Sequence, residues 1–156
     1  MYKTPGETRL RLLARARDLW NEHGIDAIGV RDLARDLDLS PGNVSYHFPR
    51  KQDLVRALMD ELRERNAEAH EGAPNDGTFE GFLARTRTIF LTQHAYRCLA
   101  GSIVHVTDAY PEIARDYRTV DRDRRRSLAS QLRALERAGE LDGPEDEAGL
   151  ARVVGT

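Results

Sequence analysis

The sequence predicts an all-α fold. Apolar residues recur at three- and four-residue steps along most of the chain, which is the spacing of one face of an α-helix. No stretch of the sequence shows the alternation of apolar and polar residues that marks a half-buried β-strand. Glycine and proline interrupt the helical pattern at intervals, so the chain is expected to divide into several helices joined by short loops.

The first two predicted helices lie within the first 37 residues. The residues with helical spacing in the first of them are Leu12, Leu13, Ala16, Leu19 and Trp20. They predict a helix over residues 7–23, which Gly24 ends. The corresponding residues in the second are Val30, Leu33, Ala34 and Leu37. They predict a short helix over residues 30–37, with Gly29 as an acceptable N-cap.

A third, very short helix is predicted over residues 41–47. Ser40 can accept a hydrogen bond from an unsatisfied backbone N–H group at the helix start, and Pro41 suits the first helical position. Pro49 ends this segment. A longer fourth helix follows and becomes polar over residues 63–71; its apolar residues are Leu54, Val55, Leu58 and Leu62.

The remainder of the chain is also predicted to be helical. Residues 72–77 are rich in glycine, proline and asparagine, which indicates a loop and the only plausible internal boundary. The segments predicted after it are a helix with one face from Phe79 to His94, a helix over residues 99–108, a helix from Pro111 to Gly139, a loop over residues 142–147 and the start of a helix over residues 148–154.

The composition of the chain excludes several classes of protein. Its 156 residues are 32% charged and 40% hydrophobic, with a net charge of -2, which is typical of a soluble globular protein rather than a disordered or membrane protein. The alternating charges of residues 121–126 are interpreted as a solvated helix face, not a nucleic-acid patch. Residues 1–7 lack the apolar core of a secretory signal, and Cys98 is the only cysteine, so we expect a cytoplasmic protein.

The segments 30–37 and 41–47 together predict a helix-turn-helix, whose second helix is small enough to enter the major groove of DNA. Because successive residues turn by about 100° around a helix, Val44 and Phe48 share a face and are expected to pack inward. The outward residues and the start of the next helix form the predicted DNA-binding set, which is Pro41, Gly42, Asn43, Ser45, Tyr46, His47, Arg50 and Lys51.

The chemistry of these residues suits a DNA groove. Asn43 can donate to and accept from base edges, and Ser45 can contact a base or a phosphate. Tyr46 and His47 offer rings with polar ends. Lys51 lies where an ammonium group and the unsatisfied N–H groups of a helix start both favour a phosphate oxygen. We therefore expect this face to contact DNA.

Four motifs follow one another in this region: Val30-Arg31-Asp32-Leu33-Ala34, Leu39-Ser40-Pro41-Gly42-Asn43-Val44, Ser45-Tyr46-His47-Phe48 and Lys51-Gln52-Asp53-Leu54. Over about residues 8–56 they resemble the DNA-binding signature of the TetR family of bacterial transcriptional regulators. The resemblance implies a three-helix DNA-binding domain followed by a helical effector-binding and dimerisation domain. It also places Asn43, Ser45, Tyr46 and His47 on the family's groove-facing positions and Lys51 on its phosphate-contacting lysine.

Three features depart from the family pattern. Ser45 stands where most members have an aromatic residue, usually tyrosine, which leaves the operator preference open. Arg50 replaces the small polar residue that usually caps the fourth helix. Since arginine has no acceptor, we expect either a later helix start or help from Asp53. Family members are commonly longer, with two further helices in a four-helix dimer interface. The second domain is therefore expected to be incomplete at its C-terminus, or the chain to be an atypically short member.

The resemblance further implies a ligand pocket enclosed by the fifth, sixth and seventh helices. The residues predicted to line it are Phe82, Phe90, His94, Tyr96, Cys98, His105, Tyr110 and Tyr117. The alternative for each of them is an ordinary place in the core. His94, Cys98 and His105 also raise the alternative of a metal-sensing site, but no fourth ligand is evident, and we expect neither a metal nor another cofactor.

These observations predict a sequence-specific transcriptional regulator with two domains, residues 1–52 and 53–156. Its expected partners are a pseudo-palindromic DNA operator, a small-molecule effector that releases a repressor, and a second copy of the chain, with no membrane. The alternative is a ligand- or protein-binding helical module that has lost DNA binding; the polar face of residues 42–47 counts against it. No catalytic motif is found in residues 78–156, so we do not expect an enzyme.

Overall fold

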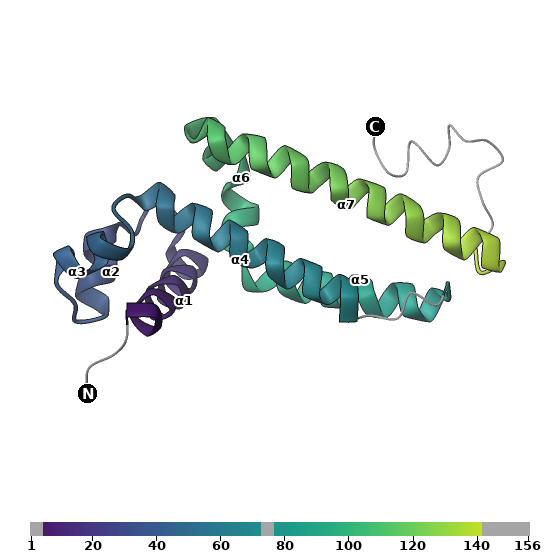
Figure 1. The fold of residues 1–156 in the computed structure, drawn as a ribbon, viewed down its shortest axis with the longest axis horizontal. Coiled ribbons are helices and arrows are strands. Elements are labelled where there is room, and N and C mark those ends of the chain that lie inside the picture. Colours follow the sequence, from purple (N-terminus) through teal and green to yellow (C-terminus); the bar gives the residue numbers. More distant parts are fainter. Residues whose placement is uncertain (1–4, 73–76, 142–156) are drawn as a thin grey trace.

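The structure, a computed structural model, describes residues 5–72 and 77–141. Every element within these two ranges is a helix, which confirms the all-α prediction (Figure 1). The helices are α1 (Pro5–His23), α2 (Val30–Asp36), α3 (Pro41–His47), α4 (Lys51–Gly72), α5 (Phe79–Ala95), α6 (Arg97–Ala109) and α7 (Pro111–Ala138). The predicted loop over residues 142–147 and the helix start over residues 148–154 lie outside the described residues.

Local hydrogen bonds explain where several of these helices begin and end. The Ser40 hydroxyl accepts a hydrogen bond from the Asn43 N–H group at 3.1 Å, which confirms the predicted N-cap of α3. The Thr78 hydroxyl caps α5 in the same way through the Gly81 N–H group at 3.0 Å. Gly139 ends α7 with a φ of 73°, a left-handed conformation that glycine adopts without strain.

The first three helices form a compact unit around a buried tryptophan. Trp20 is almost fully buried, and its indole N–H donates a hydrogen bond to the Ile28 carbonyl at 3.1 Å. This bond ties the loop after α1 to the helix itself and satisfies the one polar atom of the ring. The apolar faces of α1 and α2 meet here. α3 packs against α2, and the two form the helix-turn-helix.

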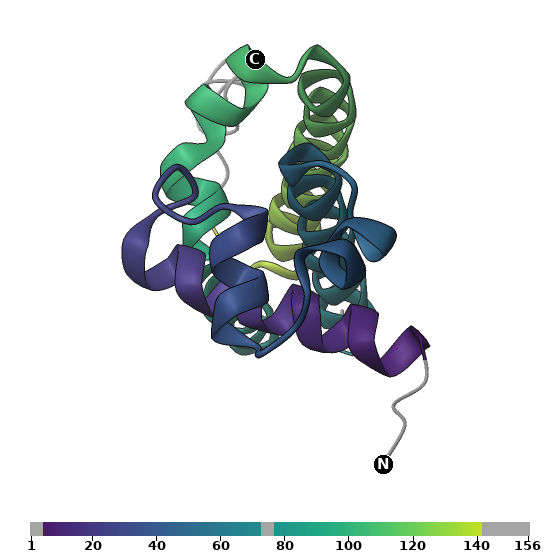
Figure 2. The same cartoon turned by 90° about the vertical axis from the view of Figure 1, so that its left-hand side faces the viewer.

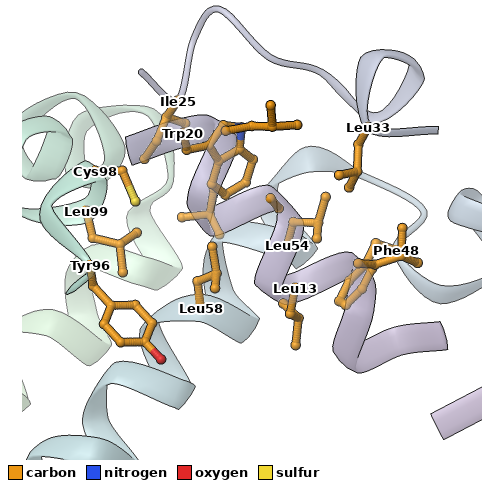
Figure 3. Close-up of a cluster of buried hydrophobic side chains, with 14 of the residues drawn as sticks. Leu13, Trp20, Ile25, Leu33, Phe48, Leu54, Leu58, Tyr96, Cys98 and Leu99 are labelled. Carbon is orange, nitrogen blue, oxygen red and sulfur yellow. The ribbon is translucent and has the colours of Figure 1, made fainter. Parts of the chain in front are cut away.

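The core of this unit continues into the rest of the chain without a break. Leu54 and Leu58 of α4 pack against α1, and beyond them Tyr96, Cys98 and Leu99 join the same cluster (Figure 3). Burial of such side chains stabilises the fold by about 1.5–3 kcal/mol each. The predicted domain boundary between residues 52 and 53 falls in the first turn of α4, so this helix belongs to both predicted domains.

The second half is built on two helix pairs. α5 packs along α4, and α6 meets the 28-residue α7 near the start of α7 (Figures 1 and 2). α6 also lies against α1, which connects the two halves a second time. None of the helices in residues 5–72 and 77–141 is both long enough and apolar enough to cross a membrane.

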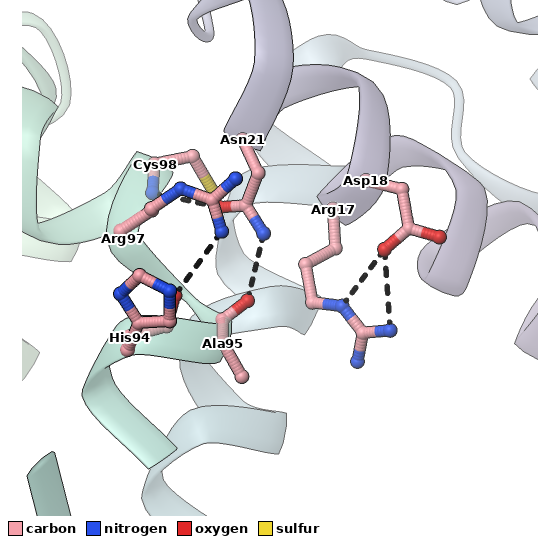
Figure 4. Close-up of polar contacts among 7 residues, drawn as sticks. All are labelled: Arg17, Asp18, Asn21, His94, Ala95, Arg97 and Cys98. Carbon is pink, nitrogen blue, oxygen red and sulfur yellow. Dashed lines mark hydrogen bonds and ion pairs between the residues drawn. The ribbon is translucent and has the colours of Figure 1, made fainter. Parts of the chain in front are cut away.

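A single amide side chain holds α1 to the joint between α5 and α6. The Asn21 side-chain N–H group donates to the Ala95 carbonyl at 2.8 Å, and its oxygen accepts from the Cys98 backbone N–H group at 2.9 Å (Figure 4). The Arg17 guanidinium lies over the Tyr96 ring at 5.3 Å from its centre. The last turns of α1 therefore contact the end of α5 and the start of α6 at once.

Candidate DNA-binding surface and ligand cavity

The helix α3 has one buried and one exposed face. Val44 is fully buried and Phe48 is 2% exposed, which confirms that this pair packs inward. The Arg9 guanidinium of α1 lies 5.1 Å from the centre of the Phe48 ring and covers it. The predicted DNA-contacting residues of α3 that lie exposed on the opposite side are Pro41, Gly42, Asn43, Ser45 and Tyr46.

Tyr46 is the most prominent side chain of this exposed face. It is 78% exposed, an unusual position for a large ring in a helix with so few residues. His47 is partly buried, and its ring meets the Tyr46 ring edge to face at 5.1 Å between centres. The contact restrains Tyr46 without covering it, so the phenol stays available to a partner.

The start of α4 is organised by Asp53. Its carboxylate accepts a hydrogen bond from the Arg50 backbone N–H group at 2.9 Å, and it also forms an ion pair with the Arg50 guanidinium at 3.0 Å. These contacts hold the pKa of Asp53 below its ordinary value. Arg50 has no acceptor for a cap, and Asp53 supplies one instead, as expected.

Lys51 is the first residue of α4 and is partly exposed. None of the ion pairs in the described part of the chain involves it, whereas Arg50 beside it is bound to Asp53. An ammonium group at a helix N-terminus, where N–H groups also point outward, is a suitable phosphate site. We call Lys51 and the polar residues of α3 the α3 face (Asn43, Ser45, Tyr46, His47 and Lys51).

A cavity of about 200 Å³ lies further along α4. Four helices line it, and α4 supplies the largest share of its wall. The lining residues are Arg56, Met59, Asp60, Leu62, Arg63 and Asn66 from α4, Gln93 from α5, Leu99 and Ala100 from α6, and Ile113, Tyr117, Asp121 and Arg124 from α7. The family resemblance implied α5, α6 and α7 as walls and did not indicate the part that α4 plays.

Most of the residues predicted to line a pocket lie elsewhere. Tyr117 is the only one of the described set that lines this cavity. Tyr96 and Cys98 are buried in the core against α1, where burial raises the pKa of both groups. For these two the core alternative describes their position. Both contact α1: the Arg17 guanidinium covers the Tyr96 ring, and the Asn21 oxygen accepts from the Cys98 N–H group.

The other predicted pocket residues have varied surroundings. Phe90 is 70% exposed and His94 is exposed, while Phe82 stacks on Phe79 with ring centres 6.3 Å apart. Tyr110 packs, partly buried, on the edge of the main cluster. The side chain of His105 lies outside the described part of the structure. In the ranges that the structure describes, no three His, Cys, Asp or Glu side chains lie close enough to hold a metal ion.

Charged groups of the cavity wall are mostly paired with each other. Asp60 pairs with Arg63 at 3.4 Å on α4. On α7, Asp121 binds Arg124 closely and Arg125 at 2.8 Å, as predicted for this solvated run of charges. The two arginines, Arg125 foremost, lower the pKa of the Asp121 carboxyl.

Two polar groups of the wall lack such partners. Arg56 forms none of the ion pairs found among the described residues. Its charge contributes to the lowered pKa of Asp53, but the Asp53 carboxylate is bonded to Arg50. The Oδ1 atom of Asn66 is buried and has no hydrogen-bond partner within the described ranges. An acceptor buried in this way costs free energy until a donor reaches it. No sequence pattern singled out either residue.

Comparisons with known proteins agree with this geometry. Residues 12–58 match the sequence profile described as "Bacterial regulatory proteins, tetR family", and residues 52–154 match the one described as "Bacterial transcriptional repressor". The chain is 25% identical over 150 residues to the HTH-type transcriptional regulator UidR of Escherichia coli K12. This alignment covers 94% of the chain and 76% of UidR. It is 26% identical over 156 residues to TtgR of Pseudomonas putida, with 90% and 71% coverage.

Solved structures share the fold over nearly the whole chain. A TetR-family transcriptional regulator from Marinobacter aquaeolei VT8 superposes with a TM-score of 0.86 at 24% identity, covering 94% of this chain and 72% of that one. GusR of Salmonella enterica superposes with a TM-score of 0.70 at 24% identity, with 97% and 80% coverage. At this level of identity the likeness concerns the fold.

Proposed function

The chain belongs to the tetR family of bacterial regulatory proteins, and from that premise we propose that it is a repressor released from its operator by a small molecule. It is a DNA-binding transcriptional regulator. Regulators of this family bind operator DNA and small-molecule effectors and are dimeric. One observation carries the proposal: α4 is a single helix that begins beside the α3 face and forms the main wall of the cavity.

The DNA-binding half of the proposal rests on the α3 face. We infer that α3 enters the major groove, where Asn43 and Ser45 reach base edges. Lys51 and the first N–H groups of α4 take a phosphate, which positions the protein without reading the sequence. Ser45 is too short for the contact an aromatic side chain would make there, and the exposed Tyr46 phenol takes over that role.

The regulatory half follows from the shared helix. A dimer presents two α3 faces to a pseudo-palindrome, and half-sites one turn apart require the two helices to be about 34–36 Å apart. A molecule in the cavity that fits one position of α4 better than another shifts the population toward that position. The separation of the two α3 helices then departs from the operator spacing, and the repressor is released.

The experiment that tests the proposal is selection of bound fragments from a pool of genomic DNA at two salt concentrations. We expect enrichment of a two-fold symmetric motif, with weaker retention at the higher salt concentration because phosphate contacts release counterions. The Tyr46→Ala variant in the same pool is the matched control, and it should enrich the motif less. If the chain enriches no sequence and shows no salt-dependent retention, the proposed DNA-binding function is refuted. The alternative, a ligand- or protein-binding helical module, is then favoured.

A further inference from the structure

Part of the cavity wall is apolar. The apolar side chains of its wall are Met59, Leu62, Leu99, Ala100 and Ile113, contributed by α4, α6 and α7. At about 200 Å³ the cavity lies below the roughly 300–1,000 Å³ of pockets that hold drug-sized ligands. The occupant is therefore small, and most of its surface must be apolar.

The charged residues of the cavity wall carry a net positive charge. Three arginines and two aspartates line the cavity, and each aspartate already binds an arginine of its own helix. Asp121 binds Arg125 as well, so its negative charge is shared between two guanidinium groups. Arg56 lies at the solvent-exposed end of the wall and has no ion-pair partner among the described residues. An anion at Arg56 gains a charge-assisted bond, whereas a cation finds no unpaired carboxylate in the described wall.

The two unpartnered polar groups lie at different levels of the same helix wall. Arg56 and Asn66 are ten residues apart on α4, a rise of about 15 Å along the axis. Met59 and Leu62 lie between them on the cavity wall. A ligand that satisfies both ends is elongated, with an anionic group at one end and a hydrogen-bond donor at the other. The buried Asn66 oxygen is the acceptor for that donor.

We propose that the cavity binds a small, elongated organic monoanion, with its carboxylate at Arg56, its apolar body against Met59, Leu62 and Ile113, and a hydroxyl or N–H group at Asn66. The planar guanidinium can take a carboxylate with two parallel hydrogen bonds. That this molecule is the effector rests on the proposed function. That it binds does not, because binding is measured in the absence of DNA.

The test uses three probes of nearly equal length and isothermal titration calorimetry on the full chain. 8-Hydroxyoctanoate has both polar ends, octanoate lacks the hydroxyl group, and 8-aminooctan-1-ol replaces the carboxylate by an ammonium group. We expect 8-hydroxyoctanoate to bind about tenfold more tightly than the amino alcohol and about fivefold more tightly than octanoate. Equal affinities, tighter binding of the amine, or no binding of any probe would overturn the proposal.

Variants assign the two ends separately. Arg56→Gln should weaken both acids about tenfold and leave the amino alcohol unchanged. Asn66→Leu should abolish only the advantage of 8-hydroxyoctanoate over octanoate. Arg65→Gln is the matched control, since Arg65 lies on the same helix, pairs with Glu68 and does not line the cavity. Circular dichroism confirms that each variant is folded, and an unchanged affinity in Arg56→Gln contradicts the assignment.

The outcome is independent of the DNA experiment. If 8-hydroxyoctanoate binds through Arg56 but genomic selection enriches nothing, the cavity assignment stands and the repressor function fails. If a palindrome is enriched but the three probes bind equally or not at all, the repressor function stands and the anion site fails. Where both succeed, adding 8-hydroxyoctanoate to the operator complex shows whether the acid releases it.

Discussion

Asp53 links helix capping to the charge of the DNA-binding surface. Its carboxylate closes the start of α4 through the Arg50 N–H group and binds the Arg50 side chain at the same time. The pairing leaves Lys51, the next residue, as the cation beside α3 without an ion-pair partner in the described residues. The sequence contains the clue, because an acidic residue three positions after a helix start is the second half of a capping box.

This arrangement predicts a pH-dependent stability. The pKa of Asp53 is lower in the folded chain than the ordinary value of about 3.9, so its contribution is full above that value and is lost as the pH falls through the folded pKa. We expect Asp53→Asn to lower the Tm at pH 7, and the difference from wild type to shrink below about pH 4. Thermal denaturation from pH 7 to pH 3 measures it.

Glu64→Gln is the control for this measurement, since Glu64 is exposed on the same helix and forms no ion pair within the described ranges. Its effect on the Tm should be small at every pH. A loss of stability in Asp53→Asn that is the same at pH 7 and pH 3 would show that the carboxylate charge contributes nothing.

Lys51 and Tyr46 can be separated by the salt dependence of DNA binding. Lys51→Ala removes one phosphate contact, so the slope of log affinity against log salt should fall by about one unit. Tyr46→Ala should weaken binding with a smaller change in slope, because a phenol carries no charge. Titration of the selected operator at four salt concentrations measures both. Arg65→Ala, remote from α3, is the control, and unchanged binding in both test variants would refute the assigned surface.

At the scale of elements, sequence patterns predict the helices well and their neighbours poorly. The ends of α3 and α7 follow from Ser40, Pro41 and Gly139, which act within their own turns. The place of α4 in the cavity wall depends on its position relative to α7, about sixty residues away. The charges at Arg56, Asp60 and Arg63 have helical spacing, and alone they are indistinguishable from a solvated face.

The residues predicted to line a ligand pocket also show that contacts between distant helices cannot be predicted from local spacing. Tyr96 and Cys98 have the chemistry of a pocket, but α1 covers them in the folded chain. Of the predicted residues that the structure describes, only Tyr117 lines the cavity beside α4. The exposure of Asn43, Ser45 and Tyr46 follows from spacing within one short helix, so it could be predicted from the sequence.

The contact between α1 and the α5–α6 joint predicts a strong effect of one amide. Asn21→Ala removes two hydrogen bonds and leaves the Cys98 N–H group, in a partly buried place, without its acceptor. We expect the free energy of unfolding to fall by about 2 kcal/mol. Urea denaturation measures it. Asn43→Ala is the matched control, since Asn43 is exposed on α3, and an equal loss in both variants would contradict the role given to Asn21.

At the scale of the whole molecule, one core connects the helix-turn-helix to the helices around the cavity. The buried cluster runs from Leu12 through Leu54 and Leu58 to Leu99 and Ile113. No seam of polar residues divides this cluster in the described chain. The DNA-binding unit therefore depends on α4 and α6 for part of its own burial.

This continuity predicts a single cooperative unfolding transition. Trp20, the only tryptophan, reports on the first three helices, and far-ultraviolet circular dichroism reports mainly on α4 to α7. We expect both signals to change at the same urea concentration with the same slope. Two separate midpoints would show that the N-terminal unit unfolds independently.

The buried thiol of Cys98 has one more consequence. Thiol reagents attack the thiolate, and burial both covers this sulfur and raises its pKa. Its backbone N–H group is bound to Asn21 of α1. We expect an alkylating reagent to react only in molecules in which α1 has moved away from α6. Since the chain has no other cysteine, the labelling rate reports how often α1 and α6 separate. This rate should fall when a bound ligand holds α6 in place.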